Sequence, residues 1–408
     1  MLSVEEALAQ LLAEIIPLPV EEAPLLECLH RVLARDAVAD IDLPPFANSA
    51  MDGFAVRAAD TAGASAEAPR RLPVVGEVAA GDPGTTPLPP GAAMRIMTGA
   101  PVPPGADAVI PVEQTRAADG AVDLLAAVTV GASVRPAGDD ARRGQRVLTA
   151  GAVLHPGEIG LLASIGYAHV PVYARPRVAI LSTGNELAPI DQAPGPGQIR
   201  NSNAAMLTAQ VLNCGAAPVP MGSARDTRES VHAAFDAGKG CDLYLSSGGV
   251  SVGDYDVVKA VLEERGGVGF WRVNMRPGKP VAFGRVDGIP FLGLPGNPVS
   301  SFVTFELFAR PLLRKLAGHG ALTRQAVPVR LDDGAPGAGS RRNYVRALVR
   351  WESNGWHAVT TGAQDSHLLR STVAANALIV VPEGSGDQAA GSMGRALLLD
   401  WPESEPPT

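Results

Sequence analysis

An alternation of apolar strands and amphipathic helices between Arg175 and Gly318 constrains the fold more than any other feature of the sequence. Strand-like runs such as RVAILST and CDLYLSS are each followed by a helical segment such as NAAMLTAQVLN or YDVVKAVLEERG. Strands that are apolar along their whole length need cover on both faces, and their alternation with helices favours a mostly parallel sheet. The sequence therefore predicts a three-layer α/β domain.

The rest of the chain differs from this domain in its pattern of apolar residues. Leucines at helical spacing behind Ser3, a good helix-capping residue, predict an N-terminal helix, and residues 22–39 predict a second helix. Short apolar runs divided by proline and glycine are typical of β structure. The chain accordingly divides into four predicted parts: a discontinuous domain of 1–42 and 131–174, a β-rich arm over 43–130, the α/β domain over 175–320, and a strand-rich C-terminal domain over 321–402.

The length, charge and composition of the chain disfavour several classes of binding partner and site. A chain of 408 residues is longer than one hydrophobic core usually supports. A net charge of -8 disfavours a nucleic-acid partner, because nucleic-acid phosphates attract basic surfaces. Three widely separated cysteines indicate neither a disulfide framework nor a paired-cysteine metal site. No apolar run reaches the ~18 residues of a membrane span, and the acidic start differs from a signal peptide. A cytoplasmic protein without a membrane partner is expected.

Four strands of the predicted sheet end in loops that combine glycine with polar or charged residues. In an open parallel sheet, ligands bind outside the carboxyl ends of the strands, where the loops meet. These loops are therefore expected to form one site. They contain Thr183-Gly184-Asn185-Glu186, Arg225-Asp226, the stretch SSGGVSVGDYD (246–256), and Pro295-Gly296-Asn297-Pro298-Val299-Ser300.

The stretch SSGGVSVGDYD permits three interpretations. Its Gly-x-Ser-x-Gly pattern resembles a serine-hydrolase elbow with Ser251 as nucleophile. Its glycine spacing resembles a phosphate-binding loop, although Asp254 stands where that loop has lysine. Asp254 and Asp256 are also a pair of carboxylates that suits a divalent cation.

The surrounding sequence favours the third interpretation. An elbow serine follows its strand directly, but Ser246 to Gly249 intervene here, and the downstream histidines lie beyond the α/β region. The missing lysine argues against a nucleotide phosphate loop of the Walker type. What remains is a glycine-rich loop whose amides bind a phosphate, with Asp254 as a Mg²⁺ ligand and Ser251 as a loop donor. Asp256 is interpreted as an acid in the first turn of a helix.

Basic residues suggest a second kind of ligand. Arg272, Arg276 and Lys279 surround a Pro-Gly turn, and in an acidic protein this favours an oxyanion or phosphate site over a plain solvated turn. A strand over 342–350 brings alternate residues to one face, for which a solvated arginine stripe is the simple explanation. The alternating residues are Arg342, Tyr344, Arg346, Leu348 and Arg350.

Several stretches, in this order, resemble the molybdopterin molybdenumtransferase family, the MoeA type that is related to gephyrin. They are PFANSAMDGFAV, RIMTGAPVPPGADAVIPVE, GNEL, GGVSVGDYD, RPGKP and GLPGNPVS. The resemblance covers nearly the whole chain. It implies a discontinuous dimerisation domain, a β-rich arm, a molybdopterin-binding α/β domain and a C-terminal β-barrel-like domain, which agrees with the division predicted above.

The resemblance also implies a reaction and an assembly. The family hydrolyses the phosphoanhydride of adenylylated molybdopterin with Mg²⁺ and molybdate, and releases AMP as the dithiolene binds molybdenum. The implied assembly is an elongated homodimer in which the arm of one subunit reaches the α/β domain of the other. Other proteins of cofactor biosynthesis are candidate partners.

Roles for individual residues follow from the same resemblance. Asp52, Thr98, Glu186, Asp226 and Asp254 match catalytic positions, of which Glu186, Asp226 and Asp254 suit Mg²⁺. Arg276, Lys279, Arg346 and Ser366 match the family's molybdate-binding positions, and Ser300 lies nearby in the PGNPVS loop. Molybdate is itself an oxyanion, which those acids would repel. The substrate-binding positions are Asp140, Thr183, Gly184, Ser247, Gly248, Gly249, Ser251, Pro295, Gly296, Asn297 and Pro298.

Two departures and two alternatives accompany this assignment. Arg276 stands where many members have lysine, and Asn185 replaces a commoner acid before Glu186. Neither removes a principal role. The alternatives are a molybdopterin adenylyltransferase-like activity and a gephyrin-like scaffold without catalysis. The arm and C-terminal domain argue against the first, and retention of the acids argues against the second.

Overall fold

The computed structural model describes residues 1–248 and 256–401, which form two compact units. The larger unit comprises Met1–Glu22, His30–Ala34 and the chain from Pro171 onward. The smaller unit comprises Ala23–Leu29 and Arg35–Val170. The chain passes from one unit to the other within β1 (Val20–Pro24) and within β12 (His169–Tyr173).

A six-stranded mixed sheet is the centre of the larger unit. Its strand order is β16-β13-β17-β21-β20-β18. The first four strands run parallel, and β20 and β18 continue the sheet in antiparallel pairing. The bounds are β13 (Arg177–Thr183), β16 (Ala217–Ala224), β17 (Leu243–Ser247), β18 (Gly266–Arg272), β20 (Pro280–Val286) and β21 (Ile289–Leu294).

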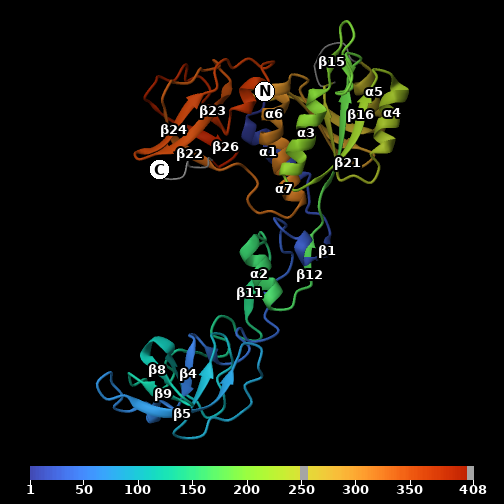
Figure 1. Ribbon diagram of the computed structural model, residues 1–408. Coiled ribbons are helices and arrows are strands. Elements are labelled where there is room, and N and C mark those ends of the chain that lie inside the picture. Colours follow the sequence, from blue (N-terminus) through green and yellow to red (C-terminus); the bar gives the residue numbers. More distant parts are fainter. Residues whose placement is uncertain (249–255, 402–408) are drawn as a thin grey trace. The chain divides into compact units, whose positions relative to one another are not determined.

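Helices cover both faces of this sheet, which confirms the predicted three-layer α/β architecture (Figure 1). One core joins the sheet to α1 (Val4–Ala13), α3 (Ser202–Asn213), α6 (Pro298–Thr304), a π-helical turn (Phe305–Ala309) and α7 (Arg310–Leu316). A second core joins the other face to α4 (Arg228–Ala237) and α5 (Asp256–Arg265). Helix α1 starts where predicted, because the Glu6 amide donates to Ser3 Oγ and the Ser3 amide donates to Glu6 Oε2.

The C-terminal part of the larger unit is a closed five-stranded barrel. Strand β23 pairs with both β24 and β25, and β22 and β26 complete the ring, so the expectation of a β-barrel-like domain is confirmed. Strand β19 (Met275–Arg276) adds to the outside of β23. The remaining bounds are β14 (Leu187–Ala188), β15 (Ile199–Arg200), β22 (Ala326–Leu331), β23 (Arg342–Glu352), β24 (Gly355–Thr360), α8 (Arg370–Val373), β25 (Ala377–Val381) and β26 (Met393–Leu398).

The smaller unit is β-rich, as the pattern of short apolar runs predicts. Its main sheet has the order β7-β4-β6-β5-β9-β8. The sheet strands are β4 (Gly53–Val56), β5 (Arg70–Val78), β6 (Ala93–Ile96), β7 (Ala108–Pro111), β8 (Thr115–Ala118) and β9 (Ala121–Leu124). Two short pairs, β2 (Ala37–Val38) with β11 (Arg146–Leu148) and β3 (Asn48–Ser49) with β10 (Val134–Arg135), accompany helix α2 (Pro156–Ser164) and the 3-10 turns η1 (Leu25–Glu27), η2 (Ala58–Thr61) and η3 (Val112–Gln114).

The second helix predicted over residues 22–39 is wrong. Strand β1, the turn η1 and strand β2 occupy this segment instead. His30 has a φ of 64°, a left-handed conformation that no α-helix can pass through. Side chains such as Cys28, Val32 and Ala37 are buried without the helix that their spacing suggested.

None of the helices described is long and apolar enough to cross a membrane.

The register in which β18 pairs with β20, as an antiparallel ribbon, can be tested by substitution. A Cβ atom on Gly284 would collide with the carbonyl oxygen of Gly267 across the ribbon, whereas a Cβ on Gly267 would meet open space. We expect Gly284→Ala to lower the free energy of unfolding by more than about 2 kcal/mol. The matched control Gly267→Ala should stay within about 1 kcal/mol of wild type. Urea denaturation of both variants measures the difference, and equal stabilities would contradict the register.

Candidate functional site

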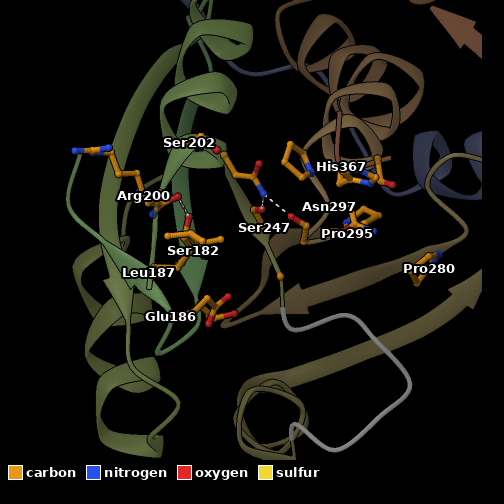
Figure 2. Close-up of a pocket in the computed structure, with 18 residues that line it drawn as sticks. Ser182, Glu186, Leu187, Arg200, Ser202, Ser247, Pro280, Pro295, Asn297 and His367 are labelled. Atoms are coloured by element: carbon orange, nitrogen blue, oxygen red, sulfur yellow. Dashed lines mark hydrogen bonds between the residues drawn. The ribbon is translucent and has the colours of Figure 1, made fainter. Parts of the chain in front are cut away.

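The carboxyl ends of β13, β17 and β21 surround a cavity of about 700 Å³ (Figure 2). The loops that follow these strands line it together with the start of α3. In Figure 2, Glu186, Ser247, Asn297 and His367 come from different segments around one space. We call this space the substrate cavity, because residues predicted to bind substrate line it. The predicted site residues on its wall are Thr183, Glu186, Ser247, Gly248, Pro295, Gly296, Asn297, Pro298 and Ser300.

Glycine geometry shapes the loop after β13. Gly184 has a φ of 147°, and a Cβ there would collide with the carboxylate of Glu186. Glycine therefore allows Glu186 to fold back over its own turn. Gly184 itself does not line the cavity, although it permits the conformation of a residue that does.

Asp226 lies beside this loop rather than on the cavity wall. The Asn185 amide donates to Asp226 Oδ2 at 3.3 Å, and the Asp226 amide donates to Asn185 Oδ1 at 3.3 Å. This reciprocal pair ties the loop after β16 to the loop after β13. The predicted magnesium ligands Glu186 and Asp226 therefore lie on neighbouring loops, with only Glu186 on the cavity wall.

The loop after β17 is described as far as Gly248. The predicted residues Gly249, Ser251 and Asp254 lie outside the described residues, and their roles stay predictions. Gly248 has a φ of 92°, and its amide donates to the carbonyl of Leu294 at 3.1 Å. That amide is thus engaged by the neighbouring strand end, whereas the rest of the predicted phosphate-binding loop lies outside the described residues and its role stays a prediction.

A second cavity of about 260 Å³ adjoins the substrate cavity, since Pro280 and Ser300 line both. We call it the basic cavity, because Arg276, Lys279 and Arg341 line it together with Gln364, Asp365 and Ser366. Its wall therefore includes the predicted oxyanion residues Arg276, Lys279, Ser300 and Ser366. Two hydrogen bonds fasten the Ser366 segment to the loop after β21: Asn297 Nδ2 donates to Ser366 Oγ at 3.2 Å, and the Val299 amide donates to the Ser366 carbonyl at 3.1 Å.

Arg346 is buried behind the basic cavity and is only 1% exposed. Its Nε donates to Ser371 Oγ at 3.0 Å, and its Nη2 donates to the Asp365 carbonyl at 3.3 Å. No described carboxylate forms an ion pair with it. Burial lowers the pKa of Arg346 to about 10; the nearby Asp365 carboxylate opposes this shift, and the charge of Arg276 adds to it. The interpretation of β23 as a solvated arginine stripe is therefore wrong at this position.

The predicted residues of the arm and of its flanks lie in the smaller unit. Asp52 Oδ1 accepts hydrogen bonds from the hydroxyl and the amide of Thr98, both at 2.7 Å. These bonds, the hydroxyl first, hold the pKa of Asp52 below its usual range, so its side chain is a carboxylate at neutral pH. The Asp140 amide donates to the Leu43 carbonyl at 2.9 Å. That Asp52 and Thr98 complete a site in a second copy, and that Asp140 binds substrate, stay predictions.

Sequence reasoning missed several residues of the substrate cavity. Asn203, in the first turn of α3, donates through Nδ2 to Ser247 Oγ at 2.7 Å and to the Gly296 carbonyl at 2.8 Å. His367 reaches the cavity from the segment between β24 and α8. The signal for Asn203 was the polar run RNSN directly before a helix, whereas His367 had no local signal. The other missed lining residues with polar side chains are Ser182, Arg200, Asn201 and Ser202.

Acids and a histidine also cluster on the barrel, away from both cavities. Asp332, Glu352 and His357 place their ligand atoms within 4.8 Å of one another. Arg350 forms ion pairs with both Asp332 and Glu352. Its guanidinium already pairs with both carboxylates, so the cluster is better explained as an ion-pair network than as a metal site.

The fold defines a three-layer α/β domain followed by a β-barrel domain in the larger unit, with a β-rich smaller unit. Three family models match the chain: the MoeA N-terminal region (domain I and II) over residues 2–166, a probable molybdopterin binding domain over 179–315, and the MoeA C-terminal region (domain IV) over 328–393.

Individual relatives agree with these matches. The molybdopterin molybdenumtransferase 2 of Mycobacterium tuberculosis is 42% identical over 379 residues, which cover 90% of this chain and 92% of the relative. The molybdopterin molybdenumtransferase of Bacillus subtilis is 37% identical, with 95% and 97% covered. A crystal structure of a molybdopterin biosynthesis MoeA protein from Pyrococcus horikoshii superposes with a TM-score of 0.81 at 33% identity, covering 98% of this chain and 100% of that chain. The chain belongs to the molybdopterin molybdenumtransferase family, which makes it an enzyme of molybdenum cofactor biosynthesis.

The buried charge of Arg346 leads to a prediction about stability. Burying a guanidinium without a carboxylate partner is costly, so an apolar side chain of similar length should be tolerated. We expect Arg346→Met to keep a free energy of unfolding within about 1 kcal/mol of wild type. The control is Arg265→Met, since the Arg265 side chain is 11% exposed and, unlike Arg346, donates to two carboxylates, those of Asp236 and Asp287. Its loss should cost about 2 kcal/mol. Urea denaturation compares the two, and a larger loss for Arg346→Met than for Arg265→Met would contradict this account.

Proposed function

We propose that this chain transfers molybdenum from molybdate to adenylylated molybdopterin, with Mg²⁺-dependent hydrolysis of the phosphoanhydride and release of AMP. The observation that supports this most directly is the adjacency of two cavities with opposite chemistry. The substrate cavity has the carboxylate of Glu186 on its wall, and the basic cavity has Arg276 and Lys279. A phosphoanhydride with its cation suits the first, and a free oxyanion suits the second.

The chemistry divides into two balanced steps. Water adds its oxygen to one phosphorus of the phosphoanhydride as the bridging P–O bond breaks, and the protons of that water pass to the phosphate products or to solvent. The two thiols of molybdopterin then replace one oxo ligand of molybdate, which leaves as water without any change in the oxidation state of molybdenum. In this proposal, Arg276 and Lys279 hold the oxyanion beside the substrate while Ser300, shared by both cavities, lies between the two ligands.

The carboxylates present fit a magnesium ion. Oxygen ligands from one or two carboxylates, together with substrate phosphates, are the usual protein environment of Mg²⁺. Glu186 and Asp226 lie on adjacent loops that are hydrogen-bonded to each other, and we propose that they hold the ion with Asp254. When bound, the ion would neutralise charge on the phosphates. We further propose a cytoplasmic homodimer, in which Asp52 and Thr98 from the arm of one copy complete the site of the other.

The carboxylate assignment is tested by AMP release from adenylylated molybdopterin at varied Mg²⁺. We expect Glu186→Gln to lower the rate about 100-fold, because it removes a carboxylate proposed to hold the Mg²⁺ ion that neutralises the phosphates. Asp226→Asn should lower it about tenfold and raise the Mg²⁺ concentration needed for half-maximal rate. Asp191→Asn, an exposed carboxylate on the turn between β14 and β15, is the control that should match wild type. An unchanged rate in Glu186→Gln would remove this residue from the proposed machinery.

The oxyanion assignment is tested by molybdate binding. Charge-assisted hydrogen bonds from Arg276 and Lys279 should supply most of the affinity, so the double variant Arg276→Gln/Lys279→Gln should bind molybdate about 30-fold more weakly. Lys259→Gln, which removes a cation from the exposed face of α5, should bind as wild type does. Calorimetric titration of molybdate into each protein gives the comparison. Wild-type affinity in the double variant would place the oxyanion elsewhere.

A further inference from the structure

We propose that Asn203 is a positioning residue that directs the hydroxyl proton of Ser247 into the substrate cavity, where it serves as the donor for a phosphate oxygen. The inference rests on the proposed function, since it assigns part of the site for the phosphate-bearing substrate. Figure 2 shows Ser247 at the end of β17, with the hydrogen bond that reaches its hydroxyl drawn as a dashed line.

The orientation of the Asn203 amide is fixed by its surroundings. One neighbour of its amide group is the Gly296 carbonyl oxygen, 2.8 Å away, and a carbonyl can only accept a hydrogen bond. The atom that faces Gly296 must therefore be Nδ2 and not Oδ1. The same nitrogen carries a second hydrogen, which is donated to Ser247 Oγ at 2.7 Å.

This orientation determines where the Ser247 proton can go. A serine hydroxyl has one proton to donate and two lone pairs with which to accept. Asn203 occupies a lone pair, because Nδ2 is a donor only. Among the described residues, no protein group accepts the Ser247 proton, and Ser247 lines the substrate cavity. The proton is therefore available to an acceptor atom of a bound ligand.

The neighbouring backbone makes this hydroxyl important. The Gly248 amide, which would otherwise be the donor at the end of β17, is already bound to the Leu294 carbonyl. At this strand end, within the residues that the structure describes, the Ser247 hydroxyl is the donor left for a ligand. An oxygen of a phosphate, which accepts hydrogen bonds and donates none when ionised, fits that donor.

Asn203 is held rigidly enough to perform this task. It lies in the first turn of α3, whose N-terminus is capped by Asn201 Oδ1 accepting from the Ala204 amide at 3.0 Å. Asn203 Oδ1 is buried and has no hydrogen-bond partner within the described part of the chain. The amide keeps this orientation although one acceptor is left unsatisfied, because the reverse orientation would set two oxygens against each other at Gly296.

The deciding experiment reverses the direction of the serine proton. Asn203→Asp is nearly isosteric, but at neutral pH a carboxylate can only accept, so it should take the Ser247 proton away from the ligand. We expect Asn203→Asp to bind AMP about 30-fold more weakly than wild type, and Ser247→Ala about tenfold more weakly. Asn203→Ala, which leaves the hydroxyl free to turn, should lose only about threefold. Calorimetry on the full chain measures the affinities.

Two controls separate this role from charge repulsion and from loss of fold. Ser202→Asp places a carboxylate in the same turn on the same cavity wall, at a residue whose side chain forms no hydrogen bond with Ser247, and should weaken AMP binding less than Asn203→Asp. Thr208→Val lies further along α3, where Thr208 bonds only the Ala204 carbonyl, and should match wild type in affinity and melting temperature. In a Ser247→Ala background, Asn203→Asp should cost less than threefold further, since the proton it captures is gone.

The outcomes distinguish this inference from the proposed function. If wild type releases no AMP from adenylylated molybdopterin, the proposed function is contradicted. If wild type releases AMP normally and Asn203→Asp binds AMP as wild type does, only the role of Asn203 is contradicted. Equal losses in Asn203→Asp and Ser202→Asp would also overturn it, because charge alone would then explain the effect.

Discussion

The parallel pairing of β13, β17 and β21 is the constraint on which the site depends. In this register Ser182 of β13 lies opposite Ser247 of β17, and Ser247 lies opposite Leu294 of β21. The three strands therefore end at the same level, and the loops that follow are brought together without long connections. Each loop needs only one or two polar residues, because the sheet supplies the convergence. A shift of two residues in any pair would move one loop out of reach of the others.

The division into two cavities follows from electrostatics. Carboxylates that bind a cation would repel a free oxyanion, and so would the phosphates of the substrate. The cation with its phosphates and the oxyanion therefore need separate binding surfaces. The structure separates Glu186 from Arg276 and Lys279 but lets the cavities share Ser300 and Pro280. The hydrogen bonds from Asn297 and Val299 to Ser366 hold the barrel segment against the loop after β21. Under the proposed function, this contact between the barrel segment and the loop keeps the phosphate-bearing substrate and the oxyanion, both negatively charged, apart and yet within reach of each other.

Much of this arrangement could be predicted from sequence, because strand ends are encoded locally. The periodicity predicted the three-layer domain, and the residues predicted to form the site include half of those that line the substrate cavity. What failed depends on contacts distant in the chain. The left-handed His30 overrides the helical pattern of residues 22–39. Asn203 and His367 belong to the site only because they pack against β17 and against the loop after β21. These contacts join residues distant in the chain, so no local sequence pattern indicates them.

Arg346 shows the limit of alternation as a guide to exposure. On β23, Val345, Ala347 and Val349 fill the barrel interior, so alternation correctly places Arg346 on the outer face. That face is covered by the segment that supplies Gln364, Asp365 and Ser371, and the guanidinium is buried there without a described carboxylate partner. A ligand anion in the basic cavity would offset part of that cost, since binding to the folded state stabilises it. Under the proposed function, the charge of Arg346 therefore makes the protein without an oxyanion less stable than the protein that has bound one. Arg346 thereby links oxyanion binding to the contact between the barrel and the α/β domain.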